Sequence, residues 1–274
     1  MKKLFFCLGL YALLSALQSC KKKDTTTPDP TPSPAAGMCL VKTMTLDSVP
    51  FLSFEFDANN RVAAFNNGFI GNHSQITYTG ATITTKEYNS NNVLLTTTLE
   101  YLNSDQYIET GTSQGIDTLY GSNPVARNMW DTATYQYDAA KYLLKEIHKK
   151  RTVEIVSGKE TIYYDTTYFT VQNENVTHVL RKIHSVSTSG TSVQTNDNTY
   201  TFGNDLNTSG QVQSPDGVFL SPFSNKGKKS KNRTLTESSI GGSPQTISYT
   251  LNSSAYIITE QNSWGNWAYI YYCY

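Results

Sequence analysis

A short pattern of alternating aromatic residues followed by a turn recurs along most of this chain. Residues 135–147 read Tyr-Gln-Tyr-Asp, then Ala-Ala-Lys, then a second short apolar run. Alternating large side chains lie on one face of a β-strand, and Asp, Asn, Ser and Gly favour the tight turn that follows. One such hairpin cannot bury its apolar face alone, so the copies must lie side by side. The pattern therefore predicts an all-β fold: an antiparallel meander of repeated hairpins in a curled sheet or barrel-like form.

Other segments repeat this order of parts. Residues 100–108 and 249–257 share Leu-Asn-Ser-x-x-Tyr-Ile, residues 54–62 carry Phe-Glu-Phe-Asp before the turn, and weaker copies lie at 77–83 and 87–94. Turn residues recur roughly every 8 to 14 positions, a spacing typical of hairpins and not of alternating strands and helices. We expect about a dozen strands. A helix over residues 139–151 is the less favoured alternative to a strand there.

These copies resemble the YD-repeat pattern, Tyr-x-Tyr-Asp-x-x-Gly-x-Leu. Over roughly residues 39–274 the chain is similar to a family of Bacteroidetes-type lipoproteins of unknown function with YD-repeat-like β-hairpin domains. The resemblance implies a repeat-built β-domain and gives no activity. Asn60 and Lys141 stand where the pattern has Gly, so the turn type does not follow from the resemblance.

Residues 1–20 have the layout of a lipoprotein signal peptide. Lys2 and Lys3 precede an apolar run, residues 4–17, that is too short to cross a bilayer. The run ends in Leu-Gln-Ser-Cys, which resembles a lipobox whose Cys20 is diacylated, with palmitate among the acyl groups. The alternatives are an ordinary cleaved signal peptide and an uncleaved anchor. We expect a lipid-anchored protein of the outer membrane.

Residues 21–37 read as a flexible linker rich in Lys, Thr and Pro. Its alternating prolines favour an extended chain of about 3 Å per residue, which would hold the following domain, residues 38–274, up to roughly 50 Å from the membrane. The three lysines at 21–23 would lie among the lipid headgroups. Related lipoproteins of the outer face often carry acidic residues there, so the periplasmic and extracellular faces both remain open.

The composition excludes some functions and gives no catalytic motif. The formal net charge is zero, which argues against nucleic acid as a partner. The four histidines form no metal-binding motif, and no G-x-S-x-G sequence is present, so no metal, cofactor or catalytic residue is predicted. The histidines are His73, His148, His178 and His184.

Two cysteines remain once Cys7 is removed with the signal and Cys20 is acylated. Cys39 and Cys273 lie in the first and last predicted strands, and an oxidising compartment favours a disulfide if these strands are neighbours. Closing a loop of about 235 residues would stabilise the fold by on the order of 5 kcal/mol at most. Two buried free thiols are the alternative.

Aromatic and basic residues offer possible binding surfaces. Trp264 and Trp267, together with Trp130, form a candidate ligand-binding platform for sugars, although aromatic residues in strands more often belong to a core. The irregular region 203–245 reads as a long loop or a divergent hairpin. It contains a basic run, residues 226–233, that could meet phosphate on an envelope glycolipid. A solvated, mobile loop is the more common interpretation of such a run.

A further pattern places Asp before Ser or Thr and then a small or apolar residue, and it is similar to the O-glycosylation motif of the same bacterial group. Attached glycans lie on protein surfaces. The alternative is that Asp-Thr suits the start of a strand in a Thr-rich protein. The candidate acceptors are Thr25, Ser48, Thr118, Thr132 and Thr166.

The final run, residues 267–274, is apolar on both faces, as in a strand that is covered on each side. It also resembles the closing strand of an outer-membrane barrel, but the lipobox and the Thr-rich strands argue against a membrane barrel. We expect a non-catalytic binding or scaffolding role in the cell envelope, with the membrane as partner through the N-terminal lipid and an envelope glycan or another envelope protein as ligand. A glycan-binding accessory lipoprotein is the alternative, and a hydrolase with an unrecognised site is third.

Overall fold

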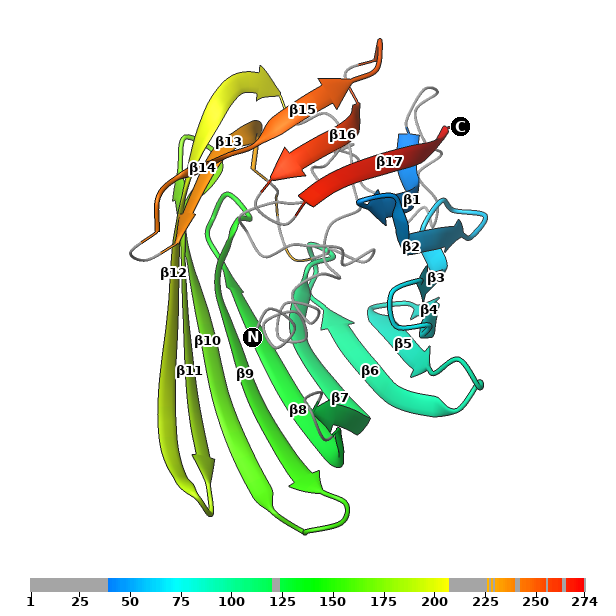
Figure 1. Cartoon of the computed structure of the whole chain (residues 1–274), viewed down its shortest axis with the longest axis vertical. Helices are drawn as coiled ribbons and strands as arrows, with labels where there is room; N and C mark the ends of the chain where they lie inside the picture. Colours follow the sequence, from blue (N-terminus) through cyan, green and yellow to red (C-terminus); the bar gives the residue numbers. More distant parts are fainter. Residues whose placement is uncertain are drawn as a thin grey trace.

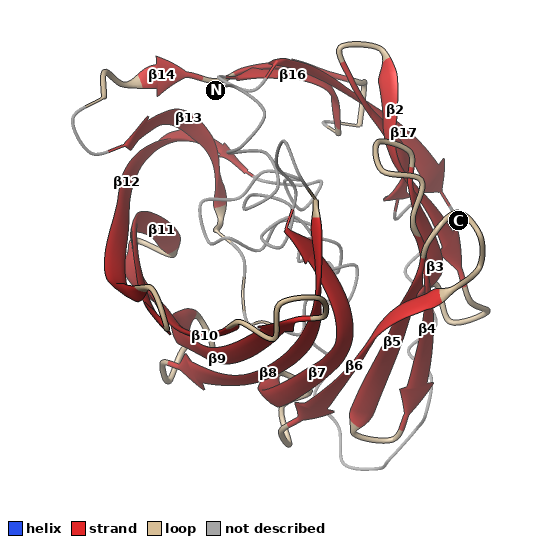
Figure 2. Ribbon diagram, turned by 60° about the horizontal axis from the view of Figure 1, so that its bottom comes forward, coloured by secondary structure: helices blue, strands red, loops and turns tan. Residues whose placement is uncertain are grey.

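The computed structural model describes residues 39–119, 124–206, 226, 228, 230–239, 242–254, 256–262 and 265–273. Seventeen antiparallel strands follow one another in meander order and curl into a nearly closed barrel (Figures 1 and 2). Cys20, the linker at 21–37 and Thr25 lie outside the described residues. The all-β meander is confirmed, with more strands than the dozen expected.

The strands divide into two sets by length. The six strands β7 to β12 contain 12 to 17 residues each, and the others contain 2 to 9. The long strands lie side by side as one tall wall of the barrel (Figure 1). The bounds are β1 Cys39–Leu46, β2 Val49–Phe56, β3 Val62–Asn67, β4 His73–Thr79, β5 Thr82–Tyr88, β6 Leu94–Leu102, β7 Ile108–Leu119, β8 Val125–Tyr137, β9 Leu143–Glu154, β10 Glu160–Gln172, β11 Asn175–Ser187, β12 Gly190–Leu206, β13 Asn232–Ser239, β14 Gln245–Thr246, β15 Ser248–Leu251, β16 Ile257–Asn262 and β17 Gly265–Cys273.

The sheet returns to its first strand. Each strand from β1 to β13 pairs with the next, β15 pairs with β16, and β16 pairs with β17. Strands β14 and β15 are separated only by Ile247, whose backbone N–H donates to Leu235 O at 2.8 Å, so together they join β13 to β16. Strand β17 then pairs with β1. Because β17 pairs with β1, few backbone N–H and C=O groups are left unpaired at an open edge of the sheet.

Period-two alternation sets an inner and an outer face on the long strands. Along β8, Arg127, Met129, Ala133 and Tyr135 are buried, and the alternating residues Asn128, Trp130, Thr132 and Thr134 are exposed. In a sheet curled on itself the shielded face is the inner one. The register places the inner residues of neighbouring strands opposite one another.

Two apolar clusters fill parts of the inner face. The first lies among the short strands and consists of Val41, Met44, Phe51, Leu52, Phe54, Val62, Phe65, Ile76, Ile83, Ile257, Trp267 and Tyr269. The second lies among the long strands and consists of Ile108, Ala133, Tyr135, Leu143, Phe169, Val176 and Val179. Burial of the apolar surface of these two clusters is the main favourable term for folding.

The repeated sequence copies fold into one repeated turn. In all five copies the side-chain oxygen of the first residue accepts a hydrogen bond of 2.8–3.0 Å from the N–H of the fifth. The fourth residue has a φ of 57 to 73° in the four copies where it is described. This left-handed conformation, otherwise typical of Gly, is taken here by Asn60, Asn92, Gln106 and Lys141. The turn copies are residues 57–61, 89–93, 103–107, 138–142 and 252–256.

The structure decides between expectations about irregular parts of the chain. In the region 203–245, β12 extends to Leu206, β13 begins at Asn232 and the two strands pair antiparallel, so the divergent hairpin is confirmed and one long loop is wrong. Strand β17 is not covered on both faces: Trp267 and Tyr269 are buried inside the barrel, but Ile270 is 62% exposed on the outside. The segment 139–151 is a turn followed by β9 and not a helix.

Candidate functional site

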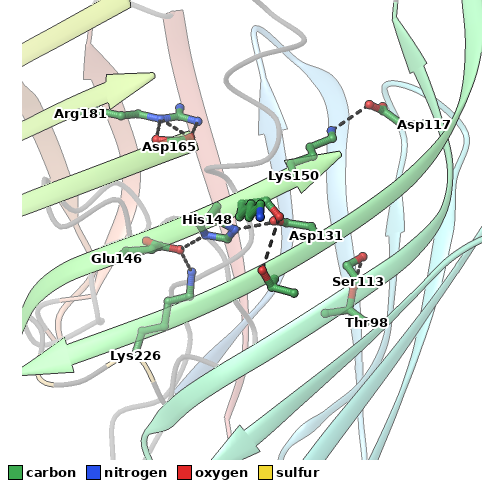
Figure 3. A network of polar contacts seen from close by, with 12 residues as sticks. Thr98, Ser113, Asp117, Asp131, Glu146, His148, Lys150, Asp165, Arg181 and Lys226 are labelled. Carbon is green, nitrogen blue, oxygen red and sulfur yellow. Dashed lines mark hydrogen bonds and ion pairs between the residues drawn. The ribbon is translucent and has the colours of Figure 1, made fainter. Parts of the chain in front are cut away.

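The most highly charged part of the interior lies on the inner face of β6 to β11 (Figure 3). We call it the inner polar network. The side chains come from inward positions of neighbouring strands and from the segment that leads to β13. Its members are Glu100, Asp117, Arg127, Asp131, Glu146, His148, Lys150, Asp165, Arg181 and Lys226.

His148 lies at the centre of the network, between two carboxylates. Its Nδ1 is 2.9 Å from Asp131 Oδ2 and its Nε2 is 2.7 Å from Glu146 Oε1. Burial opposes the charge on the ring, but the hydrogen bonds to Asp131 and Glu146 outweigh it and raise the pKa of His148 to about 10. The imidazole is therefore a cation at neutral pH, with a hydrogen bond at each ring nitrogen. Neither nitrogen is available as a general base.

Lys226 brings a distant part of the chain into the same group. Its Nζ donates to Glu146 Oε1 at 2.8 Å and lies 4.8 Å from the centre of the Tyr135 ring. Burial raises the pKa of Glu146, but Lys226 and His148 overcome this and hold it well below its usual range. The basic run at 226–233 is thus only partly solvated over its described residues, because Ser230 and Arg233 are buried whereas Lys228 and Lys231 are exposed.

Glu100 faces this group from β6. Its side chain is buried, and among the described residues none forms a hydrogen bond or ion pair with its carboxylate. Burial, opposed in part by Lys226, raises the pKa of Glu100 to about 7. The carboxyl group is therefore partly protonated near neutral pH.

Three further ion pairs extend the network along the barrel wall. Asp117 accepts from Arg127 Nη2 at 2.6 Å and from Lys150 Nζ at 2.8 Å. Burial opposes the ionised form of Asp117, but Lys150 and Arg127 lower its pKa. Arg181 Nε donates to both oxygens of Asp165, at 3.0 and 2.9 Å. Asp117 is thus matched by cations on β8 and β9, and Asp165 by a cation on β11, as a buried ionic layer requires.

The inner polar network explains part of the Asp-Thr pattern. Asp117, Asp131 and Asp165 point inward to their cations, so the residue that follows each, by the period of two, points outward. These pairs lie in mid-strand, so the expected alternative of strand starts is wrong for them. Thr118, Thr132 and Thr166 are on the outer face and Ser48 is exposed in the turn between β1 and β2, positions that a modifying enzyme can reach.

The predicted site residues are not brought together. Trp267 is only 4% exposed and its ring packs edge-on against Phe51, with centroids 5.0 Å apart, so it is a core residue and not part of an exposed platform. Trp264 lies outside the described residues. Trp130, by contrast, is 42% exposed on the outer face of β8.

The register places Cys39 directly opposite Cys273 where β1 pairs with β17. Directly opposed residues of an antiparallel pair have Cα atoms about 4.5 or 5.5 Å apart, and both values lie within the range that a disulfide spans. The disulfide was expected if the first and last strands are neighbours, and they are. The disulfide itself stays a prediction. Among the described residues, no group of three or more potential ligands could hold a metal ion, and no helix is long and apolar enough to cross a membrane.

Sequence reasoning missed the inner polar network. The available signal was the recurrence of Asp at inward positions of Asp117, Asp131 and Asp165, with basic residues in the strands that follow. Which cation meets which carboxylate depends on strand register, and the contribution of Lys226 depends on a contact across 80 residues of sequence.

No protein-family model matches this sequence, and neither does any curated protein. Two solved structures are similar in fold. One is a porin-like protein from Bacteroides vulgatus ATCC 8482, with 11% identity and a TM-score of 0.56 over 86% of this chain and 99% of that one. The other is a porin-like protein from Bacteroides uniformis ATCC 8492, with 16% identity and a TM-score of 0.52 over 89% and 99%. At such identities the likeness shows the fold alone, and that fold is a porin-like β-barrel.

Proposed function

We propose that this protein is a lipid-anchored cell-envelope protein whose barrel stands in water beside the outer membrane. In this proposal it has a non-enzymatic binding or scaffolding role and does not form a membrane channel. The porin-like description of the two Bacteroides structures supports an outer-membrane setting, and the lipobox-like sequence at Cys20 supports attachment through lipid.

The observation that carries the proposal is the polarity of the outer face. A membrane barrel needs an outward apolar band about 25 Å tall. Here the outer positions of β8 are Asn128, Trp130, Thr132 and Thr134. Those of β9 are Lys145, Ile147, Lys149, Arg151 and Val153, so three of these five are cations.

The energetic cost of placing this wall in lipid would be large. Each Lys or Arg at the bilayer midplane costs about 2–4 kcal/mol, so Lys149, Arg151 and Lys182 would together cost on the order of 6–12 kcal/mol. That is comparable with the whole stability of a typical domain. Water is therefore the favourable surrounding for these strands.

The interior also argues against a channel. Porins of the membrane type have a polar, water-filled lumen, whereas this barrel carries two buried apolar clusters on its inner face. The charged residues between them are paired with one another and do not form a ring of one sign. A ring of one sign would favour a single kind of ion.

Fractionation of a Gram-negative host that expresses the chain tests the proposal. The wild-type protein should sediment with membranes, and Cys20→Ser should be released without detergent, since only the lipid would hold the barrel there. Cys7→Ser, within the expected signal segment, is the matched control and should remain membrane-bound. A Cys20→Ser protein that stays in membranes after a carbonate wash, and dissolves only in detergent, would contradict the proposal.

A further inference from the structure

The outer face of β8 to β11 carries cations and aromatic rings in adjoining rows. We call this surface the basic aromatic strip. Pairing in register sets Trp130 beside Arg151, Lys149 beside Tyr164, and Tyr168 beside Lys145. His184 continues the second row onto β11. The strip consists of Trp130, Lys145, Lys149, Arg151, Tyr164, Tyr168, Lys182 and His184.

The positive charge of the strip is largely uncompensated. Arg151 is paired with Glu160 at 2.8 Å, but within the described part of the chain no carboxylate forms an ion pair with Lys145, Lys149 or Lys182. The protein as a whole has a formal net charge of zero, so this is a local excess and not a general property of the surface. A local excess of cations attracts a polyanion.

The aromatic rings of the strip are held in place and partly exposed. Trp130 and Tyr164 are each 42% exposed and Tyr168 is 41% exposed. Cations lie over their faces: Arg151 is 5.0 Å from the Trp130 ring and Lys145 is 5.2 Å from the Tyr168 ring. Such cation–π contacts favour a fixed ring orientation.

An open hollow of about 360 Å³ adjoins the Trp130 end of the strip. It is lined by Gln114, Asn128 and Trp130, among others, so amide groups lie beside an indole ring. Gly115 permits the close approach of β6 and β7 here, because a Cβ on it would lie 2.0 Å from Leu95 O. From Arg151 to Lys145 the strip runs a further six residues, about 20 Å.

We propose that the basic aromatic strip and the adjoining hollow bind an acidic polysaccharide. The lysines would neutralise its carboxylate groups, the aromatic rings would stack on the apolar C–H faces of the sugar rings, and the amides in the hollow would hydrogen-bond hydroxyl groups. The inference rests on the proposed function, because a barrel embedded in lipid would not offer this face to a polymer in water.

The observations favour a linear acidic glycan over an anionic membrane surface. The strip follows the long axis of the strands, and most positions between its charged and aromatic residues are hydroxyl or amide side chains such as Thr132, Gln136 and Thr166. Ile147, between Lys145 and Lys149, is an apolar residue isolated among them. A surface that enters the headgroup region of a bilayer instead presents a continuous apolar face beside its cations.

Binding to polygalacturonate, a polymer of acidic sugars, tests the proposal. The full chain carrying Cys20→Ser removes the lipid contribution and serves as the reference protein. Lys149→Glu/Lys182→Glu should weaken binding by at least about tenfold. Lys42→Glu/Lys86→Glu makes the same charge change at exposed lysines of β1 and β5 and should stay within about twofold of the reference. Equal losses in both double variants would overturn the assignment of the strip.

The contribution of the rings separates a glycan from any other polyanion. The reference protein should bind polygalacturonate about threefold more tightly, or better, than poly-L-glutamate, and Tyr164→Ala should remove this preference. Equal affinity for the two polymers would contradict sugar recognition. Binding to phosphatidylglycerol vesicles with no binding to polygalacturonate would identify a membrane surface and overturn the proposal.

These outcomes are distinct from failure of the proposed function. If Cys20→Ser remains in carbonate-washed membranes after its signal segment has been cleaved, the barrel is embedded and both proposals fail. If it is soluble but does not bind polygalacturonate, the barrel stands in water and only the glycan inference fails.

Discussion

Replacing Lys226 with Ala tests whether the basic segment is anchored inside the barrel. In the structure Lys226 donates to Glu146, and the two side chains are only 14% and 16% exposed. Its ammonium also lies over the ring of Tyr135. The substitution therefore leaves a buried carboxylate with one cation, His148, where it had two.

The expected loss of stability depends on His148, the cation that remains beside Glu146. Breaking a buried ion pair by removing one member costs about 3–5 kcal/mol when the other charge is left alone. Glu146 keeps its hydrogen bond to His148, which satisfies part of its charge. We therefore expect Lys226→Ala to lower the free energy of unfolding by about 2 kcal/mol, less than the full value.

Urea unfolding, followed by tryptophan fluorescence, measures this change. Lys228→Ala is the matched control, since Lys228 lies two positions away and is exposed, and it should cost less than about 0.5 kcal/mol. In a double-mutant cycle with Glu146→Gln, the effect of Lys226→Ala should fall to about half or less, because the carboxylate charge is then absent. Equal effects of Lys226→Ala and Lys228→Ala, with no coupling to Glu146, would refute the anchoring.

Four further outcomes follow from the structure. The pKa of His148 rises from 6.5 to about 10 in the folded protein, so its stabilising contribution is complete below about pH 6.5 and is lost as the pH rises toward 10; urea midpoints should fall across this interval and change less in His148→Gln. Lys141 has a φ of 73°, so Lys141→Gly should raise the free energy of unfolding by about 0.5 kcal/mol, and a loss of stability would contradict the strain. Cys39 and Cys273 are opposed in register, and intact mass spectrometry should show a gain of two hydrogens on reduction, with two free thiols as the contrary result. An intact mass of the native protein above that of the lipidated polypeptide would support O-glycosylation. Peptide mapping of the glycan to Thr166, which lies between Tyr164 and Tyr168 on β10, would place it on the basic aromatic strip. There it would compete with the proposed polysaccharide ligand.

The turn repeat was predictable because its interactions are local. Asp57, Asn103 and Asp138 each accept a hydrogen bond from the backbone N–H four residues later, and no distant contact is needed. Asp138 was correctly identified as a turn residue, with Lys141 at the position where a Gly is usual. The copies that begin with Asn show that the same oxygen geometry serves when the charge is absent.

Which aromatic residues are buried and which are exposed was not predictable from their sequence positions. Trp267 and Trp130 both lie in alternating strands, but one faces the interior at 4% exposure and the other faces outward at 42%. Which face of a strand points inward depends on how neighbouring strands are registered, and one residue of slip exchanges the two faces. Sequence alone therefore grouped Trp267, which the structure buries, with Trp130, which it exposes.

The sequence by itself determined the class of fold: strands from period two, turns from Asp and Asn, and a meander from the short spacing between them. These properties depend on contacts within a few residues. The tertiary structure alone decided that seventeen strands close on one another, that Lys226 meets Glu146 across 80 residues, and that Cys39 meets Cys273. It also turned three Asp residues inward and left the lysines and rings of β8 to β11 outside, because only closure of the sheet makes one face an interior.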